Sequence, residues 1–161
     1  MIRPLMLAAL AAALASCSPN SGEAAAQSTQ AAPMAHPVSG LPVVPLRVIH
    51  GDKTFAFRVE LAGTPQEQAK GLMFRTAMGA DEGMIFPFDP PRGASFWMRN
   101  TVIPLDLIFV GPDGRISNIA ANAIPYDESP LNSIGPAKAV LELNGGRAKE
   151  LGIVPGDRVE W

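Results

Sequence analysis

The chain has little of the side-chain chemistry that disulfides, metal sites and nucleic-acid surfaces require. Its 161 residues include one cysteine and two histidines. A lone cysteine excludes an internal disulfide, and these three residues cannot fill a structural zinc site of four nitrogen and sulfur ligands. The 13 basic residues are outnumbered by 15 acidic ones, which argues against the basic face that binds nucleic acid. We therefore expect no metal, no other cofactor and no nucleic-acid partner.

The first 17 residues have the pattern of a signal peptide. Arg3 precedes the apolar run Leu5–Leu14, which has about half of the ~20 residues that a membrane-spanning helix needs. The next residues, Leu14-Ala15-Ser16-Cys17, resemble the bacterial lipoprotein box, in which the cysteine is acylated and becomes the mature N-terminus. The alternative is an ordinary secretory signal that leaves a spare thiol.

Acyl chains on Cys17 would hold the protein durably on a membrane. Cleavage of the signal peptide would remove Arg3 and leave 12 basic and 15 acidic residues. Electrostatic attraction to anionic lipid is therefore not the expected mode of attachment. Ser18 stands where inner-membrane retention would favour aspartate. By resemblance to the bacterial sorting rule, we expect an outer-membrane protein that faces the periplasm.

Residues 18–40 predict a disordered tether, since they are rich in alanine, serine, proline and glutamine, with Glu23 as their one charged residue. Such a segment buries too little apolar surface to offset its ordering entropy. We expect His36, between Ala35 and Pro37, to be solvated.

Residues 41–161 predict a single domain of short strands separated by turn residues. Gly51-Asp52-Lys53 lies between two apolar runs and predicts a β-hairpin. Thr64-Pro65-Gln66-Glu67 has the features of a capping box, and predicts a helix to about Met73. A second short helix is expected over 144–151. The expected strands are 43–50, 54–61, 84–88, 95–99, 105–110, 116–121, 140–143 and 158–161. This pattern predicts a mainly β fold, an antiparallel barrel or sandwich with two short helices.

Four segments together resemble a known family. They are Gly71–Arg75, Gly83–Phe86, Phe96–Thr101 with Pro104-Leu105-Asp106, and Leu141–Asn144. In this order and spacing the chain is similar to the small bacterial and archaeal family called domain of unknown function 192, over roughly residues 48–159. The resemblance implies a compact all-β barrel or jelly-roll-like sandwich. It implies no activity, because none is established for the family.

Asp106 interrupts the apolar strand 105–110, on the same face as Ile108 and Val110. A charge buried there requires a partner, and we expect Arg75 in preference to Arg99. The carboxylate then serves either a ligand or a structural ion pair.

Glu142 is a second carboxyl within an apolar strand. Two half-buried carboxyls, Asp106 and Glu142, raise the alternative of a cell-wall glycan hydrolase, since glycosidases use a pair ~5–10 Å apart. Their convergence cannot be deduced from sequence. His50 has no catalytic motif around it and is expected to be an exposed hairpin residue.

The segment Trp97–Thr101 is the strongest candidate for binding, because it combines an aromatic plate with donors and a hydroxyl. Such a set suits sugar or carboxylate ligands. Met73, Met84 and Met98 lie in the same motifs and raise a second alternative, an envelope Cu(I) site, although methionine also fills gaps in aromatic cores.

We therefore predict a monomeric, lipid-anchored binding or accessory module for a small polar or sugar ligand, in preference to an enzyme. The expected ligand-binding residues are Arg75, Trp97, Arg99, Asn100, Thr101, Asp106, Glu142 and Asn144.

If Cys17 carries the anchor, Cys17→Ala should release the protein from the membrane fraction, because no other acylation site precedes the domain. Fractionation of cell envelopes followed by immunoblotting measures this. Ser18→Ala is the matched control and should stay with membranes. Sedimentation of the Cys17→Ala protein with membranes would show the lipoprotein hypothesis to be wrong.

Overall fold

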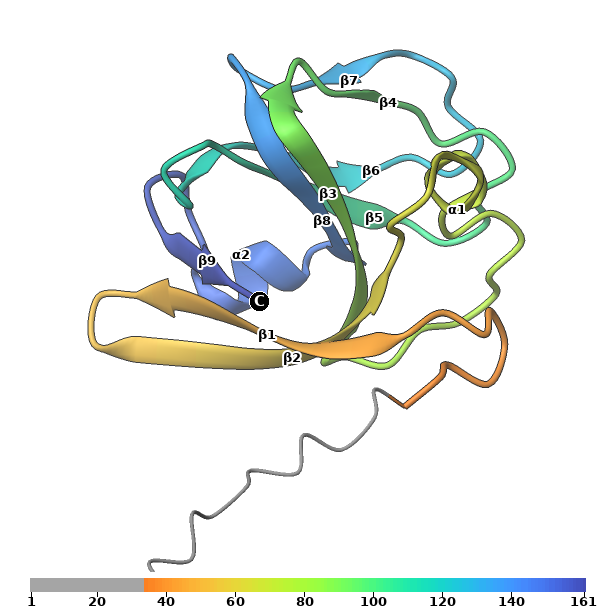
Figure 1. Ribbon diagram of the computed structural model, residues 1–161, viewed down its shortest axis with the longest axis horizontal. Coiled ribbons are helices and arrows are strands. Elements are labelled where there is room, and N and C mark those ends of the chain that lie inside the picture. Colours follow the sequence, from red (N-terminus) through yellow and green to blue (C-terminus); the bar gives the residue numbers. More distant parts are fainter. Residues whose placement is uncertain (1–33) are drawn as a thin grey trace, which may run out of the picture. The chain divides into compact units, whose positions relative to one another are not determined.

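The computed structural model describes residues 34–161 (Figure 1). The predicted signal peptide, Cys17 and most of the predicted tether lie outside the described residues. Within 34–161, no helix has both the length and the apolar character to cross a membrane.

A seven-stranded sheet forms the body of the domain, in the order β6-β5-β8-β3-β2-β1-β9, and a two-stranded sheet pairs β4 with β7 (Figure 1). The strands are β1 (Val43–His50), β2 (Lys53–Leu61), β3 (Glu82–Arg92), β4 (Ser95–Phe96), β5 (Leu105–Val110), β6 (Ile116–Ala123), β7 (Leu131–Asn132), β8 (Ala137–Asn144) and β9 (Arg158–Glu160), with helices α1 (Pro65–Lys70) and α2 (Arg147–Leu151).

The predicted hairpin and first helix are confirmed. β1 and β2 are antiparallel across the turn at Gly51 and Asp52. The Thr64 hydroxyl accepts a hydrogen bond from the Glu67 N–H, and the Glu67 carboxylate accepts one from the Thr64 N–H, so the capping box is complete. α1 ends earlier than predicted because Gly71 turns the chain with φ +49°.

The mainly β, sandwich-like fold is confirmed, but the sheet is mixed and is not a closed barrel. β2 and β3 run parallel, because α1 provides the crossover between them. The edge strands approach each other through the isolated Arg115–Arg158 bridge without forming a continuous ladder. The predicted strand 95–99 ends at Phe96, and the short β7 that pairs with it was not predicted.

The sheet separates two apolar cores, because alternate residues of each strand face opposite sides. On β5, Ile108 and Val110 join the core on one face, with α2 and β9. Leu105, Leu107 and Phe109 join the core on the other face, which β4, β7 and the segment after α1 cover. Phe96 of β4 makes edge-to-face contacts there with Phe86 and Phe109, at 5.1 and 6.4 Å between ring centroids.

Gly83 of β3 has to be glycine because β8 passes close to it. A Cβ at this position would lie 2.5 Å from the Glu142 carbonyl oxygen and 2.9 Å from the Leu143 side chain. The glycine therefore allows the two central strands to pair and fixes Glu142 on the sheet.

The predicted pairing of Asp106 with Arg75 or Arg99 is wrong. The Asp106 carboxylate is fully buried and accepts three backbone hydrogen bonds: from Asn122 and Gly146 at 2.7 and 2.9 Å, and from Ala148 at 2.7 Å. Backbone donors thus satisfy the charge without an arginine.

The described structure includes a turn before Leu41, within the predicted tether. Ala35 pairs with Pro42, and Val43 N–H donates to the Met34 carbonyl, so residues 34–43 form a tight turn. His36 is mostly buried and lies 3.6 Å from Glu60; the prediction of a solvated His36 is wrong because the turn folds back on β2.

Asp106→Asn should destabilise the fold by ~1–3 kcal/mol, because the amide NH₂ would face one of the three N–H donors and leave it unsatisfied. Urea unfolding measures this. Asp52→Asn, in the exposed hairpin turn, is the control and should be neutral. An unchanged unfolding midpoint for Asp106→Asn would contradict the assigned role.

Candidate functional site

Three loops meet beside α1, at residues 71–79, 97–104 and 124–128, and we call them the loop cluster. The Phe74 N–H donates to the Asn100 carbonyl at 2.8 Å. The Tyr126 N–H is shared between the Met98 and Thr101 carbonyls at 3.1 and 3.2 Å. Backbone hydrogen bonds therefore hold the three loops together.

The loop cluster concentrates backbone strain and exposed aromatic side chains. Phe74, Asn100 and Tyr126 are non-glycine residues with φ of +63°, +54° and +63°, a conformation that costs free energy and is enriched at functional sites. Phe74 is 68% exposed, Tyr126 61% and Trp97 47%. An aromatic surface held in this way is a candidate for ligand contact.

A small inner cavity of about 40 Å³ lies between α1 and the loop cluster. Three of the predicted binding residues, Trp97, Thr101 and Glu142, line it together. The remaining lining residues are Gln68, Ala69, Lys70, Gly71, Leu72, Met73, Phe86 and Phe96.

Glu142 supplies the unusual group of this cavity. It stands on β8 between Met84 and Leu107 of the neighbouring strands, and only 5% of the residue is exposed. No hydrogen bond reaches its carboxyl from any group in residues 34–161. Burial raises the pKa of Glu142 to about 8, so the carboxyl is mostly protonated at neutral pH.

The other polar side chains of the cavity have already used their donors. The Thr101 hydroxyl donates to the Arg99 carbonyl at 3.3 Å. The Gln68 amide nitrogen donates to the Ala62 and Pro87 carbonyls at 3.1 and 2.9 Å. The Thr101 hydroxyl oxygen and the Gln68 amide oxygen can therefore still accept hydrogen bonds, but neither side chain has a free donor.

Arg99 does not face the cavity carboxyl. Its guanidinium stacks 4.0 Å from the centre of the Trp97 ring and donates to Glu128 at 2.6 Å. This hydrogen bond raises the pKa of Arg99 and lowers that of Glu128. The stacked guanidinium orients the Trp97 ring at the cavity wall.

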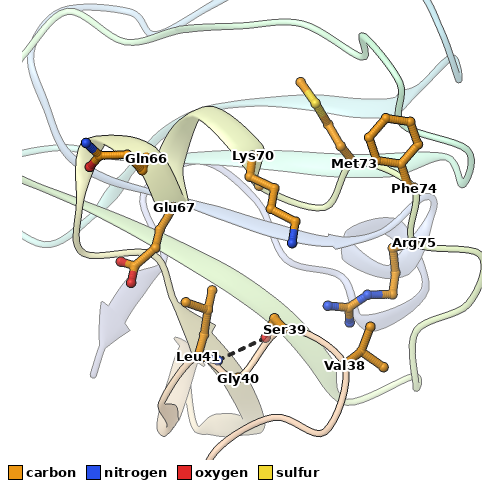
Figure 2. A pocket seen from close by; sticks show the side chains of 11 residues that line it. Val38, Ser39, Gly40, Leu41, Gln66, Glu67, Lys70, Met73, Phe74 and Arg75 are labelled. Carbon is orange, nitrogen blue, oxygen red and sulfur yellow. Dashed lines mark hydrogen bonds between the residues drawn. The ribbon is translucent and has the colours of Figure 1, made fainter.

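A larger outer groove of about 560 Å³ lies on the other side of the segment that follows α1, and Lys70, Gly71 and Met73 line both hollows. Figure 2 shows the Lys70 and Arg75 side chains extending into the groove. The other lining residues are Val38, Ser39, Gly40, Leu41, Gln66, Glu67 and Phe74.

Arg75 is paired with Glu60, a residue that the sequence interpretation missed. Two guanidinium nitrogens donate to the buried Glu60 carboxylate at 2.8 and 3.1 Å, and the Ser39 hydroxyl also donates to it. The sequence did contain a signal for Glu60. It is an acidic residue between the apolar residues Val59 and Leu61 of a predicted strand, which is the pattern that singled out Asp106.

The structure separates the two carboxyls of the hydrolase alternative. Asp106 pairs across the sheet with Leu143, and Leu107 pairs with Glu142. Because neighbouring residues of a strand point to opposite faces, Asp106 and Glu142 face opposite sides of the sheet. They cannot act together on one glycosidic bond.

The remaining predicted site residues lie around the loop cluster as structural contacts. The Asn144 amide donates to the Met78 and Gly79 carbonyls at 3.0 and 2.9 Å. The Asn100 amide lies 3.9 Å from the Met73 sulfur.

The methionines pack as core residues. Met84 and Met98 are fully buried in the core beneath the loop cluster, which favours packing over the Cu(I) alternative. Within residues 34–161, no group of three His, Cys, Asp or Glu residues is arranged to hold a metal ion. His50 is paired with Asp157 at 2.8 Å and lies outside both hollows.

Several solved structures resemble this chain, and two of them are described here. A protein of unknown function from Novosphingobium aromaticivorans is 64% identical, with a TM-score of 0.79 over 82% of this chain and 94% of its own. A protein from Sinorhizobium meliloti, described as a "putative transcription regulator", is 42% identical, with a TM-score of 0.72 over 74% of this chain and 94% of its own. None of the curated proteins matches.

The four motif segments that suggested a family occupy the central strands, the loop cluster and the inner cavity. A family model described as "Uncharacterized ACR", the domain of unknown function 192, matches residues 47–161. This match covers most of the chain, including every residue of the inner cavity. The chain therefore belongs to the domain of unknown function 192 family.

Proposed function

We propose that the protein is a lipid-anchored envelope module that binds a small polar ligand at the inner cavity. The observation that carries this proposal is the Glu142 carboxyl, which faces a cavity and has no hydrogen-bond partner in residues 34–161. A largely buried carboxyl that no protein donor contacts is only partly solvated, which costs free energy. A ligand that hydrogen-bonds to Glu142 recovers this cost, so the site is suited to binding.

The cavity is better suited to binding than to catalysis. Acid–base chemistry on a bound substrate generally uses two titratable groups with different pKa values. Among the residues that line the inner cavity, Lys70 is the other titratable one, and its side chain extends into the outer groove (Figure 2). Glu142 therefore has no evident catalytic partner there.

The surroundings suggest how a larger ligand would sit. The inner cavity admits one small group, while the remainder would lie over Trp97 and the neighbouring exposed aromatics Phe74 and Tyr126. Aromatic faces beside hydrogen-bonding groups suit sugar rings and other amphipathic molecules. Fragments of the cell wall are ligands of this kind that an envelope protein would meet.

The charge of the domain favours such a ligand over nucleic acid. Arg3 and Glu23 are the only charged residues before Met34, so residues 34–161 carry 12 basic and 14 acidic side chains. Binding to phosphates requires a basic surface. We therefore do not extend the description of the Sinorhizobium protein to this chain. The resemblance of Leu14–Cys17 to a lipoprotein box, followed by Ser18, supports an outer-membrane location, and we propose that the protein acts there as a monomer.

Fluorescence of Trp97 tests binding directly, because the chain has only two tryptophans and Trp161 lies against Lys138, outside both hollows. In the full chain with Trp161→Phe, soluble peptidoglycan fragments should change the emission of Trp97 in a saturable way. Trp97→Phe, which retains Trp161, is the matched control and should show no such change. A linear, non-saturable response in the Trp161→Phe protein would contradict the proposal.

The state of Glu142 predicts a pH-dependent stability. The pKa of Glu142 is about 8 in the folded chain, against 4.5 for the ordinary carboxyl. Below pH 4.5 both states hold the proton, whereas between 4.5 and 8 only the folded state does. Stability is therefore lost as the pH rises to about 8.

Glu142→Gln removes this titration and should have a higher Tm than the native chain above pH 8. The difference should be small at pH 4.5 and grow by several degrees, since 1 kcal/mol shifts Tm by ~3–6 °C in a domain of this size. Thermal unfolding from pH 4.5 to 9 measures this. Glu128→Gln, at an exposed carboxyl whose pKa is lowered, should show no such gain. A pH-independent difference for Glu142→Gln would contradict the assignment.

A further inference from the structure

We propose that the group which enters the inner cavity is a primary ammonium, held by the Glu142 carboxylate and by the aromatic walls. This inference rests on the proposed binding function and specifies its ligand chemistry. The occupant would be the terminal R–CH₂–NH₃⁺ of an alkyl amine or of an amino acid side chain.

The polar side chains of the cavity offer acceptors and no free donors once Glu142 is ionised. Thr101 and Gln68 have committed their donors to backbone carbonyls, so both keep only oxygen lone pairs for a ligand. Ionised Glu142 adds two acceptor oxygens. An ammonium group has three donors and no acceptor. It therefore complements these three side chains better than a hydroxyl or an amide does.

The walls of the cavity are largely aromatic. Phe86, Phe96 and Trp97 line the cavity together with Met73, and the Phe86 and Phe96 rings are in edge-to-face contact at 5.1 Å. Aromatic faces attract cations through their quadrupole, most strongly where water is displaced. Anions gain nothing from such walls, so the aromatic lining favours the same charge that Glu142 favours.

The inner cavity is small enough to restrict what can enter it. A volume of about 40 Å³ has room for roughly three water molecules, at ~10–15 Å³ each. The ammonium nitrogen and the adjoining methylene group fit this space, whereas a sugar ring does not. The rest of the ligand would remain outside, next to Trp97.

The charges around Glu142 leave it the uncompensated acid of the cavity. Glu60 lies on the same face of the sheet, one strand beyond Met84, and is neutralised by Arg75. Arg99 is neutralised by Glu128. Lys70, the cation of α1 that lines the cavity, extends into the outer groove (Figure 2). An incoming ammonium therefore meets one acidic group without a partner among the described residues.

Binding would exchange one proton for the cation. The empty site holds Glu142 as the carboxylic acid at neutral pH. When R–NH₃⁺ enters, the Glu142 O–H bond breaks, its proton leaves to solvent, and the carboxylate pairs with the ammonium. The affinity should then rise about tenfold per pH unit from pH 6 to pH 7, because the ionised fraction of a group with a pKa of about 8 rises by this factor.

The experiment titrates methylammonium into the full chain carrying Trp161→Phe, with Trp97 fluorescence as the readout. We expect saturable binding whose Kd falls about tenfold between pH 6 and pH 7. Acetamide and methanol, which are neutral molecules of similar size, should bind at least tenfold more weakly. The pH series uses no change at Glu142, so it stays decisive if a variant there fails to fold.

Two further variants separate the charge of Glu142 from its shape. Glu142→Gln in the same background keeps the volume but removes the charge, and should weaken methylammonium binding more than tenfold and abolish its pH dependence. Lys70→Gln, at the other titratable residue of the cavity, should bind methylammonium as well as its parent, because the Lys70 side chain extends into the outer groove and takes no part in the proposed site (Figure 2).

The outcomes distinguish this inference from the proposed function. If acetamide or methanol binds as tightly as methylammonium, or if Glu142→Gln binds methylammonium unchanged, the ammonium inference is overturned and the binding function stands. If neither methylammonium nor peptidoglycan fragments give a saturable signal, both are overturned. Saturable binding of the fragments alone, without methylammonium, overturns the inference only.

Discussion

The Asp106 carboxylate is the interaction on which the arrangement of this end of the sheet depends. It lies on β5 and draws three backbone N–H groups to itself, from the end of β6 and from the start of α2. Backbone N–H groups within a sheet are paired with the neighbouring strand, but those at the ends of loops need another acceptor. Asp106 provides that acceptor: it ties Asn122, next to the loop that carries Tyr126, to the turn that follows β8.

Glu142, one strand away, shows what the same chemical group does in the absence of donors. Asp106 points into a ring of N–H groups, whereas Glu142 points to the opposite face and into aromatic walls. Three backbone N–H groups satisfy the oxygens of Asp106, while burial raises the pKa of Glu142. One residue is thereby committed to holding the fold, and the other keeps its hydrogen-bonding capacity for a ligand.

Local patterns predicted the fold better than they predicted the pairing of charges. The hairpin, the capping box of α1 and most strand centres follow from alternation and turn chemistry within a few residues of the chain. The parallel pairing of β2 with β3 and the short β7 depend on tertiary packing, and alternation alone carries no information about them. The strands β3 and β8 extend beyond their predicted ends for the same reason.

The candidate site was predicted in part. Trp97, Thr101 and Glu142 were recognised from their residue types, and they meet in one cavity. Arg75 was recognised but was assigned to the wrong carboxylate, because Glu60 and Asp106 have the same appearance in sequence: one acid within an apolar strand. Their distinction rests on which backbone donors lie nearby, a property of the folded chain.

In the lipid-anchored arrangement that we propose, the turn at residues 34–43 has a mechanical consequence. The turn is closed by backbone hydrogen bonds between Met34 and Val43 and between His36 and Leu41. Because these bonds are arranged as in a hairpin, a force applied to the chain before Met34 would act on them one after another. β1, which is paired on both sides with β2 and β9, would bear tension along many bonds at once. Opening of the turn would withdraw Ser39 from Glu60 and displace the wall of the outer groove to which Val38, Ser39, Gly40 and Leu41 contribute.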